Sequence, residues 1–131
     1  MSRIRITGGA WRSRLVKVAD SAEGLRPTPD RVRETLFNWL GQDLSGWSCL
    51  DLFAGSGVLG FEAASRGAAM VTLVEQDQGV YAALRQNAQA LGALDGEHLE
   101  LIRRDAVKFA ASSARRYDLV FLDPPYSQGW I

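Results

Sequence analysis

The sequence predicts an α/β fold in which helices flank a mainly parallel sheet. Between residues 48 and 122, short apolar runs alternate with segments of helical spacing, and glycine, aspartate or proline bounds most of them. A strict strand–helix alternation favours parallel pairing, because the chain must cross back before each new strand. The 131 residues, 47% hydrophobic and 23% charged, suffice for a domain with a hydrophobic core.

A β-hairpin is predicted at the N-terminus. Residues 3–7 alternate charged and apolar side chains, Gly8 and Gly9 offer a turn, and residues 11–18 return as a second, less regular strand. This arrangement places Arg3 and Arg5 on one face. The opposite face would carry Arg12 and Arg14, so that the hairpin presents a small cationic surface.

A helix is predicted next. Thr28 and Pro29 have the pattern of an N-cap followed by proline at the first helical position. The apolar residues that follow recur at helical spacing, and a glycine can close the helix. They are Val32, Leu36, Trp39 and Leu40, with Gly41 as the closing residue.

The core elements then follow in order. The central strand ends near residue 52, and three later strands are expected at 70–75, 99–103 and 118–122. Helices are expected at about 58–66, from Asp77 as N-cap to Leu91, and at about 106–111. In the helix after Asp77, the expected buried stripe consists of Val80, Leu84, Ala88 and Leu91.

A glycine-rich turn joins the central strand to its helix. Gly55, Gly57 and Gly60 form the pattern G-x-G-x-x-G, in which missing side chains let a ligand approach the helix N-terminus. Glu75 ends the next strand, at the position where a nucleotide ribose is usually bound. The sequence therefore predicts a nucleotide-type ligand at this turn.

Asp51 bears on which ligand this is. A dinucleotide pyrophosphate requires bare N–H groups and a positive helix end. S-adenosylmethionine carries an ammonium and a sulfonium instead, so a carboxylate beside the turn becomes useful. The alternative is that Asp51 only accepts hydrogen bonds from backbone N–H groups of the turn.

A second motif follows the last strand. Asp123, Pro124, Pro125 and Tyr126 form a rigid run where strand ends normally feed an α/β active site. Carbonyl and carboxylate oxygens can accept the hydrogens of a planar NH₂ group while an aromatic ring stacks on its ring system. The alternative is a proline turn with a surface tyrosine.

The net charge of zero hides an asymmetry. Residues 1–35 contain eight basic and four acidic side chains, and the remainder contains seven basic and eleven acidic ones. A basic arm on an acidic body suits a phosphate backbone. A solvated hairpin face is the alternative. The basic residues of this part are Arg3, Arg5, Arg12, Arg14, Lys17, Arg26, Arg31 and Arg33.

Composition and the remaining reactive residues narrow the class. No apolar stretch is long enough to span a bilayer, and the first residues lack the apolar segment of a signal peptide, so we expect a cytoplasmic protein without membrane association. Cys49 lies in an apolar strand and cannot form an intramolecular disulfide. His98, in a loop, is expected to be exposed and not catalytic.

These motifs resemble those of class I S-adenosylmethionine-dependent amino-methyltransferases, which carry a glycine turn after one strand and (D/N/S)PP(Y/F/W) after another. Residues 4–9, 25–28 and 30–40 more specifically resemble the bacterial 16S rRNA (guanine-N2)-methyltransferase family. The resemblance covers essentially the whole chain. It implies a Rossmann-like core at residues 28–131, an N-terminal basic hairpin arm at residues 1–27, and methyl transfer from S-adenosylmethionine to guanine N2.

The resemblance also implies residue roles. The expected partner is small-subunit ribosomal RNA, free or in an assembling 30S particle, and no metal is required. Catalytic roles fall on Asp123, Pro124, Pro125 and Tyr126. Cofactor binding falls on Asp51, Phe53, Ala54, Gly55, Ser56, Gly57, Glu75, Gln76, Asp105, Ala106 and Asp123. RNA binding falls on Arg3, Arg5, Arg12, Arg14, Arg31 and Arg33, of which Arg33 could equally pair with Glu34 or another acid.

Other interpretations stay open. Family members continue through three further strands, so we expect a C-terminally truncated chain with an open sheet edge and reduced affinity and activity. DNA adenine or protein glutamine could replace guanine as substrate, because the second motif recognises an amine without naming its carrier. A nicotinamide- or flavin-linked oxidoreductase and a non-catalytic RNA-binding module are the remaining alternatives.

Overall fold

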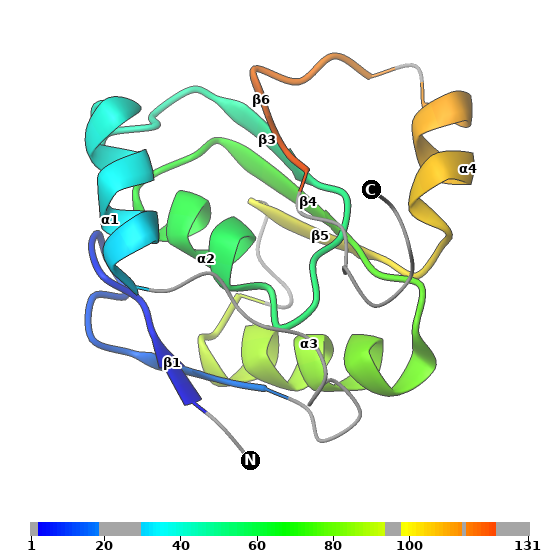
Figure 1. Ribbon diagram of the computed structural model, residues 1–131, viewed down its shortest axis with the longest axis horizontal. Helices are drawn as coiled ribbons and strands as arrows, with labels where there is room; N and C mark the ends of the chain where they lie inside the picture. The colour runs from blue at the N-terminus through cyan, green and yellow to red at the C-terminus, as the bar shows by residue number, and fades with distance from the viewer. Residues whose placement is uncertain (1–2, 19–29, 94–97, 114, 123–131) are drawn as a thin grey trace.

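The computed structural model describes residues 3–18, 30–93, 98–113 and 115–122 (Figure 1). Within these residues, a parallel sheet with the strand order β5-β4-β3-β6 occupies the middle of the molecule, as the strand–helix alternation predicts. Its strands are β3 (Ser48–Asp51), β4 (Met70–Val74), β5 (Leu99–Ile102) and β6 (Leu119–Phe121). The helices are α1 (Asp30–Trp39), α2 (Val58–Ser65), α3 (Gln78–Ala90) and α4 (Ala106–Ser112).

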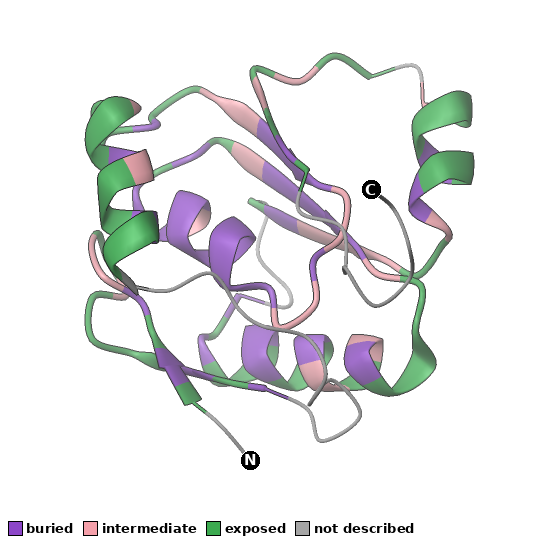
Figure 2. Ribbon diagram, in the orientation of Figure 1, coloured by how far each residue is buried: buried purple, intermediate pink, exposed green. Residues whose placement is uncertain are grey.

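Alternate residues of β3 and β4 face different layers of helices. Leu50 and Val74 pack with Phe109 of α4. The residues that alternate with these two, Cys49 in β3 and Val71 and Leu73 in β4, belong to a larger cluster, to which α1, α2 and α3 contribute. Figure 2 shows α2 buried along most of its length. Members of this larger cluster include Phe37, Cys49, Phe61, Val71, Leu73, Leu84 and Ala88.

Helix α3 agrees closely with its sequence signals. Asp77 is its N-cap, with one side-chain oxygen accepting the backbone N–H of Val80 at 2.8 Å. The helix ends at Ala90, and Gly92 follows with φ +73°. The four residues of the expected stripe are all buried: Val80, Leu84, Ala88 and Leu91.

Helix α1 also exists, but only Leu36 and Leu40 of the apolar pattern that predicts it pack against the core. Val32 is 52% exposed and Trp39 86% exposed, whereas Arg33 and Phe37 are fully buried. The reason lies on α2, where the buried Glu62 has a carboxylate oxygen 3.7 Å from Nε of Arg33. An ion pair between helices therefore helps, together with apolar packing, to set the orientation of α1.

The N-terminal hairpin consists of β1 (Arg3–Arg5) and β2 (Leu15–Lys17), paired antiparallel. Gly8 and Gly9 do not form a tight turn between the strands, which are joined by a wider loop. Instead they approach α2, and a Cβ added to Gly9 would lie 2.0 Å from the carbonyl oxygen of Ser65. The same oxygen accepts the N–H of Ala10 at 2.8 Å. These glycines thus allow the hairpin loop to contact α2.

The described sheet has an open side at β6. Val120 is 47% exposed and Leu122 is 68% exposed. Within the described residues, β6 pairs with β3 alone. No helix in this part of the chain combines the length and apolar character needed to cross a membrane.

Candidate cofactor site and nucleic-acid interface

The candidate cofactor site lies at the carboxyl end of the sheet, where β3 runs into the glycine loop (residues 52–57). Asp51 is the last residue of β3 and is 1% exposed. It lies in register with Leu73 of β4 and Phe121 of β6. A carboxylate on an inner strand of a parallel sheet is costly to bury, so its place directly before the loop favours a role at the site.

Glu75 fixes the glycine loop to the end of β4. Its Oε1 accepts the N–H of Gly55 at 2.9 Å, and its Oε2 accepts the N–H of Asp77 at 3.0 Å. A backbone bond from Ala54 N–H to the carbonyl of Val74, also 2.9 Å, lies beside this contact. Each carboxylate oxygen can accept more than one hydrogen, so Glu75 can hold the loop and still bind a ligand hydroxyl.

The three glycines of the motif have different tasks. Gly55 has φ +57°, and a Cβ placed on it would meet nothing within 4 Å, so its open side can receive a ligand. At Gly57, the N-cap of α2, a Cβ would lie 2.4 Å from Leu84. At Gly60 it would lie 2.5 Å from Leu73, so this glycine allows α2 to pack closely on β4.

The end of β5 brings a second expected group alongside. The backbone N–H of Glu75 donates to the carbonyl oxygen of Ile102, and the N–H of Arg104 donates to the backbone carbonyl oxygen of Glu75 at 3.2 Å. Asp105 follows directly, half-buried, and caps α4 by accepting the N–H of Lys108 at 2.9 Å. The other expected cofactor residues nearby are the buried Ala106, the exposed Gln76, and Phe53 and Ser56, both half-buried in the loop.

The second motif, Asp123, Pro124, Pro125 and Tyr126, lies outside the described residues, as do Thr28 and Pro29. The described chain reaches Leu122, just beyond β6.

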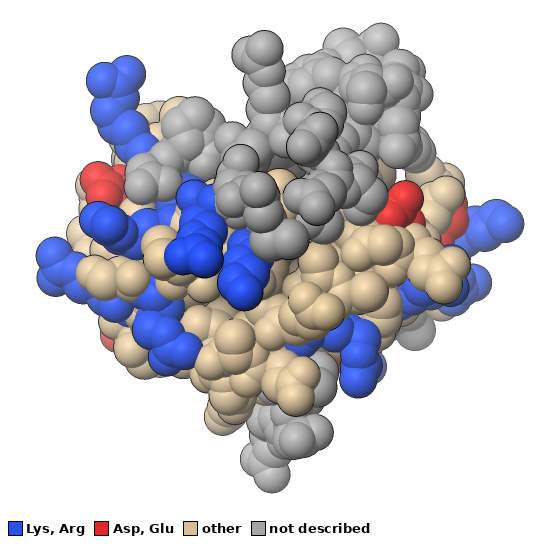
Figure 3. All heavy atoms as spheres, turned by 90° about the horizontal axis from the view of Figure 1, so that it is seen from below, with Lys and Arg blue, Asp and Glu red and all other residues tan. Residues whose placement is uncertain are grey.

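The hairpin presents cations on its solvent face. Its register places Lys17 opposite Arg3, and all three of Arg3, Arg5 and Lys17 are exposed while Ile4 and Val16 point into the protein. Lys17 was not among the residues expected to bind RNA, although its alternation with the apolar Val16 in the sequence was a usable signal. Figure 3 shows Lys and Arg spread over the face seen from below, with Asp and Glu near its edges.

Two residues expected to bind RNA are placed differently. Arg12 and Arg14 precede β2 in the loop, so they do not form the face opposite Arg3 and Arg5 that a tight hairpin would give. Both are exposed, but one guanidinium nitrogen of Arg14 donates to the carbonyl of Ala90 at the end of α3, at 2.7 Å. Arg14 therefore also attaches the hairpin to the body of the protein.

Arg33 does not belong to the exposed basic surface. Its side chain is fully buried beside Glu62 and donates to the backbone carbonyl of Arg5. This burial contradicts the expectation that Arg33 binds RNA and supports the ion pair that the sequence left open, with Glu62 as the acid. Arg31, two residues earlier on α1, is exposed.

Cys49 and His98 have no assigned role in the candidate cofactor site. Burial raises the pKa of the Cys49 thiol to about 11, with a further contribution from Asp118, so the thiol is neutral at physiological pH. His98 is exposed, as expected, and its Nδ1 lies 2.8 Å from the carbonyl oxygen of Ala69.

Comparison with known proteins identifies the family. The family model described as conserved hypothetical protein 95 matches residues 4–131. Ribosomal RNA small subunit methyltransferase D of Escherichia coli K12 is 48% identical over 129 residues, which cover 98% of this chain and 63% of the relative. The protein of the same name from Haemophilus influenzae is 48% identical over 125 residues, covering 94% and 64%.

A solved structure gives the same result. A putative methyltransferase from E. coli, yhhF, superposes with a TM-score of 0.84 and 43% identity, covering 99% of this chain and 68% of that chain. The present chain spans just under two thirds of the length of the first curated relatives. The family match over residues 4–131 shows that the chain belongs to the conserved hypothetical protein 95 family, with a class I methyltransferase fold.

Proposed function

We propose that this chain binds S-adenosylmethionine at the glycine loop and is part of a methyltransferase for small-subunit ribosomal RNA. The hydrogen bond from Gly55 N–H to Glu75 carries the proposal. A pyrophosphate would need that N–H bare, and two carboxylates at the loop, Asp51 and Glu75, would repel it. The same carboxylates suit a ligand with an ammonium and a sulfonium. The names of the relatives support the reaction class.

Different described residues would bind different parts of S-adenosylmethionine. Glu75 accepts hydrogens from ribose hydroxyls with the acceptor capacity left after Gly55 and Asp77. Asp51 balances the positive charge of the methionine portion, and Gly55 lets that portion approach the backbone. Asp105 would contact the adenine. S-adenosylmethionine, when bound, supplies a methyl group activated by its sulfonium.

The acceptor in this proposal is the N2 amine of guanine, as the resemblance implies. Asp123 and the carbonyl of Pro124 accept its hydrogens, and Tyr126 stacks on the base. The nitrogen lone pair of this amine is delocalised into the ring, so it attacks poorly. The two acceptors favour the geometry in which the nitrogen regains the pair, and stacking aligns it for in-line transfer.

Calorimetric titration tests the cofactor. Saturable binding of S-adenosylmethionine, and none of NAD, is expected. Glu75→Gln should weaken binding about 10- to 100-fold, because a charged acceptor is removed. Glu34→Gln, at an exposed glutamate of α1, is the matched control and should bind as the wild type does. Binding of NAD in place of S-adenosylmethionine would contradict the assignment.

Methyl transfer to defined substrates tests the acceptor. An RNA transcript of the small-subunit sequence should accept tritiated methyl groups. The same transcript with inosine in place of guanine should not, because inosine lacks the N2 amine. Asp123→Ala should abolish transfer while leaving cofactor binding nearly intact, and an equal loss of transfer and of cofactor binding would contradict the catalytic role of Asp123. Transfer to the inosine transcript, to DNA adenine or to protein glutamine would assign a different acceptor.

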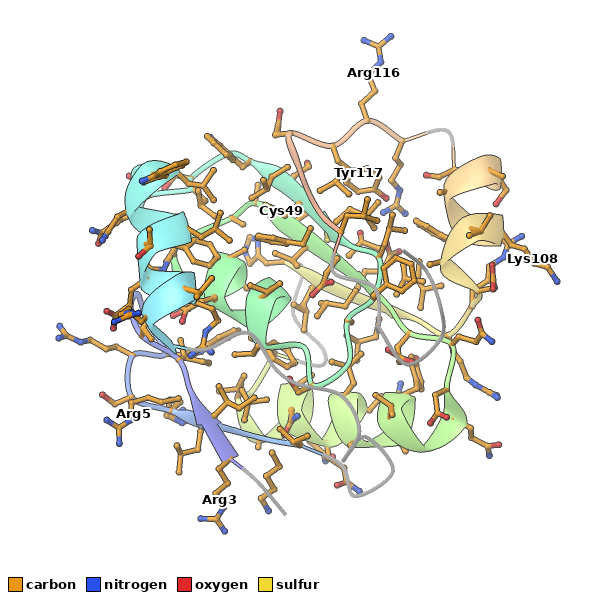
Figure 4. All side chains as sticks on the ribbon, in the orientation of Figure 1. Arg3, Arg5, Cys49, Lys108, Arg116 and Tyr117 are labelled. Atoms are coloured by element: carbon orange, nitrogen blue, oxygen red, sulfur yellow. The ribbon has the colours of Figure 1, made fainter. Side chains whose placement is uncertain are left out.

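The salt dependence of RNA affinity tests the basic surface. Replacing Arg3, Arg5 and Lys17 by Gln should lower the slope of log K against log salt by about 0.7–0.9 for each phosphate that the variant no longer neutralises. Lys108 and Arg116 supply a control, compared per charge removed, because both are exposed and Figure 4 shows them on parts of the molecule remote from Arg3 and Arg5. An equal effect of the control substitutions would show that charge alone, and not this surface, sets the affinity.

A further inference from the structure

Asn87 is a buried polar residue of α3 that the proposed chemistry does not use. Its side chain is 5% exposed. Its Oδ1 accepts the N–H of Lys17 at 3.0 Å, and its Nδ2 donates to the carbonyl oxygens of Lys17 at 2.9 Å and of Ser56 at 3.2 Å. One amide therefore joins β2 of the basic hairpin to the glycine loop.

The chemistry of these three bonds fixes the amide orientation. One partner is an N–H donor and the other two are carbonyl acceptors, so a flipped amide would point its oxygen at two carbonyl oxygens. Removing the side chain would leave three backbone groups unpaired, one of them in the glycine loop. The amide of Asn87 matches these three backbone groups, because it combines one acceptor oxygen with two donor hydrogens, which few side chains of this size can supply.

Apolar packing joins the same elements a second time. Ile4 and Val18 of the hairpin segment form a buried cluster with Val58 and Val80. Val58 is the first residue of α2, directly after the glycine loop, and Val80 lies in the first turn of α3. A displacement of the loop would therefore affect the hairpin both through the amide of Asn87 and through this apolar cluster.

We infer that Asn87 is a positioning residue that couples ligand binding at the glycine loop to RNA binding at the hairpin. The inference rests on the proposed function. A ligand that orders the loop fixes the carbonyl of Ser56, which holds Asn87 and with it the backbone of Lys17, whose side chain belongs to the exposed cationic face. Coupling of this kind is reciprocal, so RNA on the hairpin raises the affinity of the loop for its ligand by the same factor.

The test compares two RNA affinities. The dissociation constant of a small-subunit rRNA transcript is measured with and without saturating S-adenosylhomocysteine, which permits no turnover. In the wild type, the ligand should tighten RNA binding at least about fivefold, the lower end of ordinary coupling. In Asn87→Asp, which keeps the size and the bond from Lys17 N–H but removes both donors, the factor should fall below about twofold.

Two controls separate coupling from mere stability. Ala88→Gly loosens the same turn of α3 at a buried position without touching the three bonds, and should keep the wild-type factor. Gln86→Ala changes an exposed neighbour and should do the same. A wild-type factor near one, or an unchanged factor in Asn87→Asp, would overturn the coupling. Wild-type protein that binds neither probe would instead overturn the proposed function on which it rests.

Discussion

Replacing Glu62 by glutamine is the sharpest test of how the hairpin is held. The side chain is fully buried on α2. Its Oε1 accepts the N–H and hydroxyl of Thr7 at 2.6 and 2.7 Å and lies 3.7 Å from Nε of Arg33. Its Oε2 accepts the N–H of Gly8 at 3.3 Å and Nε–H of Arg66 at 3.1 Å. One carboxylate thus binds the hairpin loop through hydrogen bonds and also pairs with two arginines.

The magnitude follows from the donor pattern. Glutamine preserves the volume, but either orientation of its amide points an NH₂ group at donors that the carboxylate now accepts. It also leaves Arg33 and Arg66, both buried, facing a neutral group. Removing one partner of a buried ion pair costs about 3–5 kcal/mol. That is a large share of the roughly 5–15 kcal/mol by which domains are stable.

Urea unfolding followed by circular dichroism measures the effect. Glu62→Gln should lower the free energy of unfolding by about 3–5 kcal/mol, and Glu34→Gln, at an exposed position of α1, should change it by less than about 0.5 kcal/mol. A decrease below about 1 kcal/mol for Glu62→Gln would refute the reasoning, because the carboxylate would then not be the anchor of the hairpin loop.

Three further outcomes are expected. The thiol of Cys49, whose pKa burial raises to about 11, should react with Ellman's reagent at pH 8 far more slowly than free cysteine, and rapid reaction would contradict its burial. Gly60→Ala should lower the free energy of unfolding by about 1–3 kcal/mol, because the new Cβ would lie 2.5 Å from Leu73, and an unchanged melting temperature would show that the packing gives way easily. The hydrogen bond from Arg115 lowers the pKa of Glu100, so this carboxylate stabilises the fold above its unfolded value of about 4.3 and ceases to do so as the pH falls through its lower folded value. Glu100→Gln should therefore cost up to about 1 kcal/mol at pH 7 for this largely exposed pair, and the difference from wild type should fade in acid; a difference independent of pH would contradict the ion pair.

Features determined within a few neighbouring residues could be predicted from the sequence. Helix α3 is the clearest case, because Asp77 caps it, Gly92 follows its end, and a regular apolar stripe lies between them. Each signal acts over one or two helical turns, so no knowledge of the rest of the fold is required. The parallel sheet follows in the same way from the alternation of strands and helices.

The orientation of α1 and the shape of the hairpin loop depend on distant residues and could not be predicted in this way. Arginine is normally exposed, and the sequence left Arg33 either at the RNA-binding surface or paired with Glu34 or another acid. Its burial requires an acid on another element, and the position of Glu62 beside it is visible only in three dimensions. The usable signal was Glu62 itself, a lone charge in the otherwise apolar helix α2. An unpaired charge there would be too costly, so Glu62 could have been named as the acid that pairs with a basic residue of another element.

The same limit applies to the choice of ligand. The pattern of Gly55, Gly57 and Gly60 describes a backbone that can approach a ligand, but it does not say whether the N–H groups of that backbone are free. In this structure the N–H of Gly55 is occupied by a side chain twenty positions further along the chain, and this hydrogen bond favours a cationic ligand over a pyrophosphate. The same loop also accepts a hydrogen bond at the Ser56 carbonyl from Asn87 of α3, so residues of β4 and α3 both contact it. The residues that define this site are therefore the long-range partners of the motif as much as the motif itself.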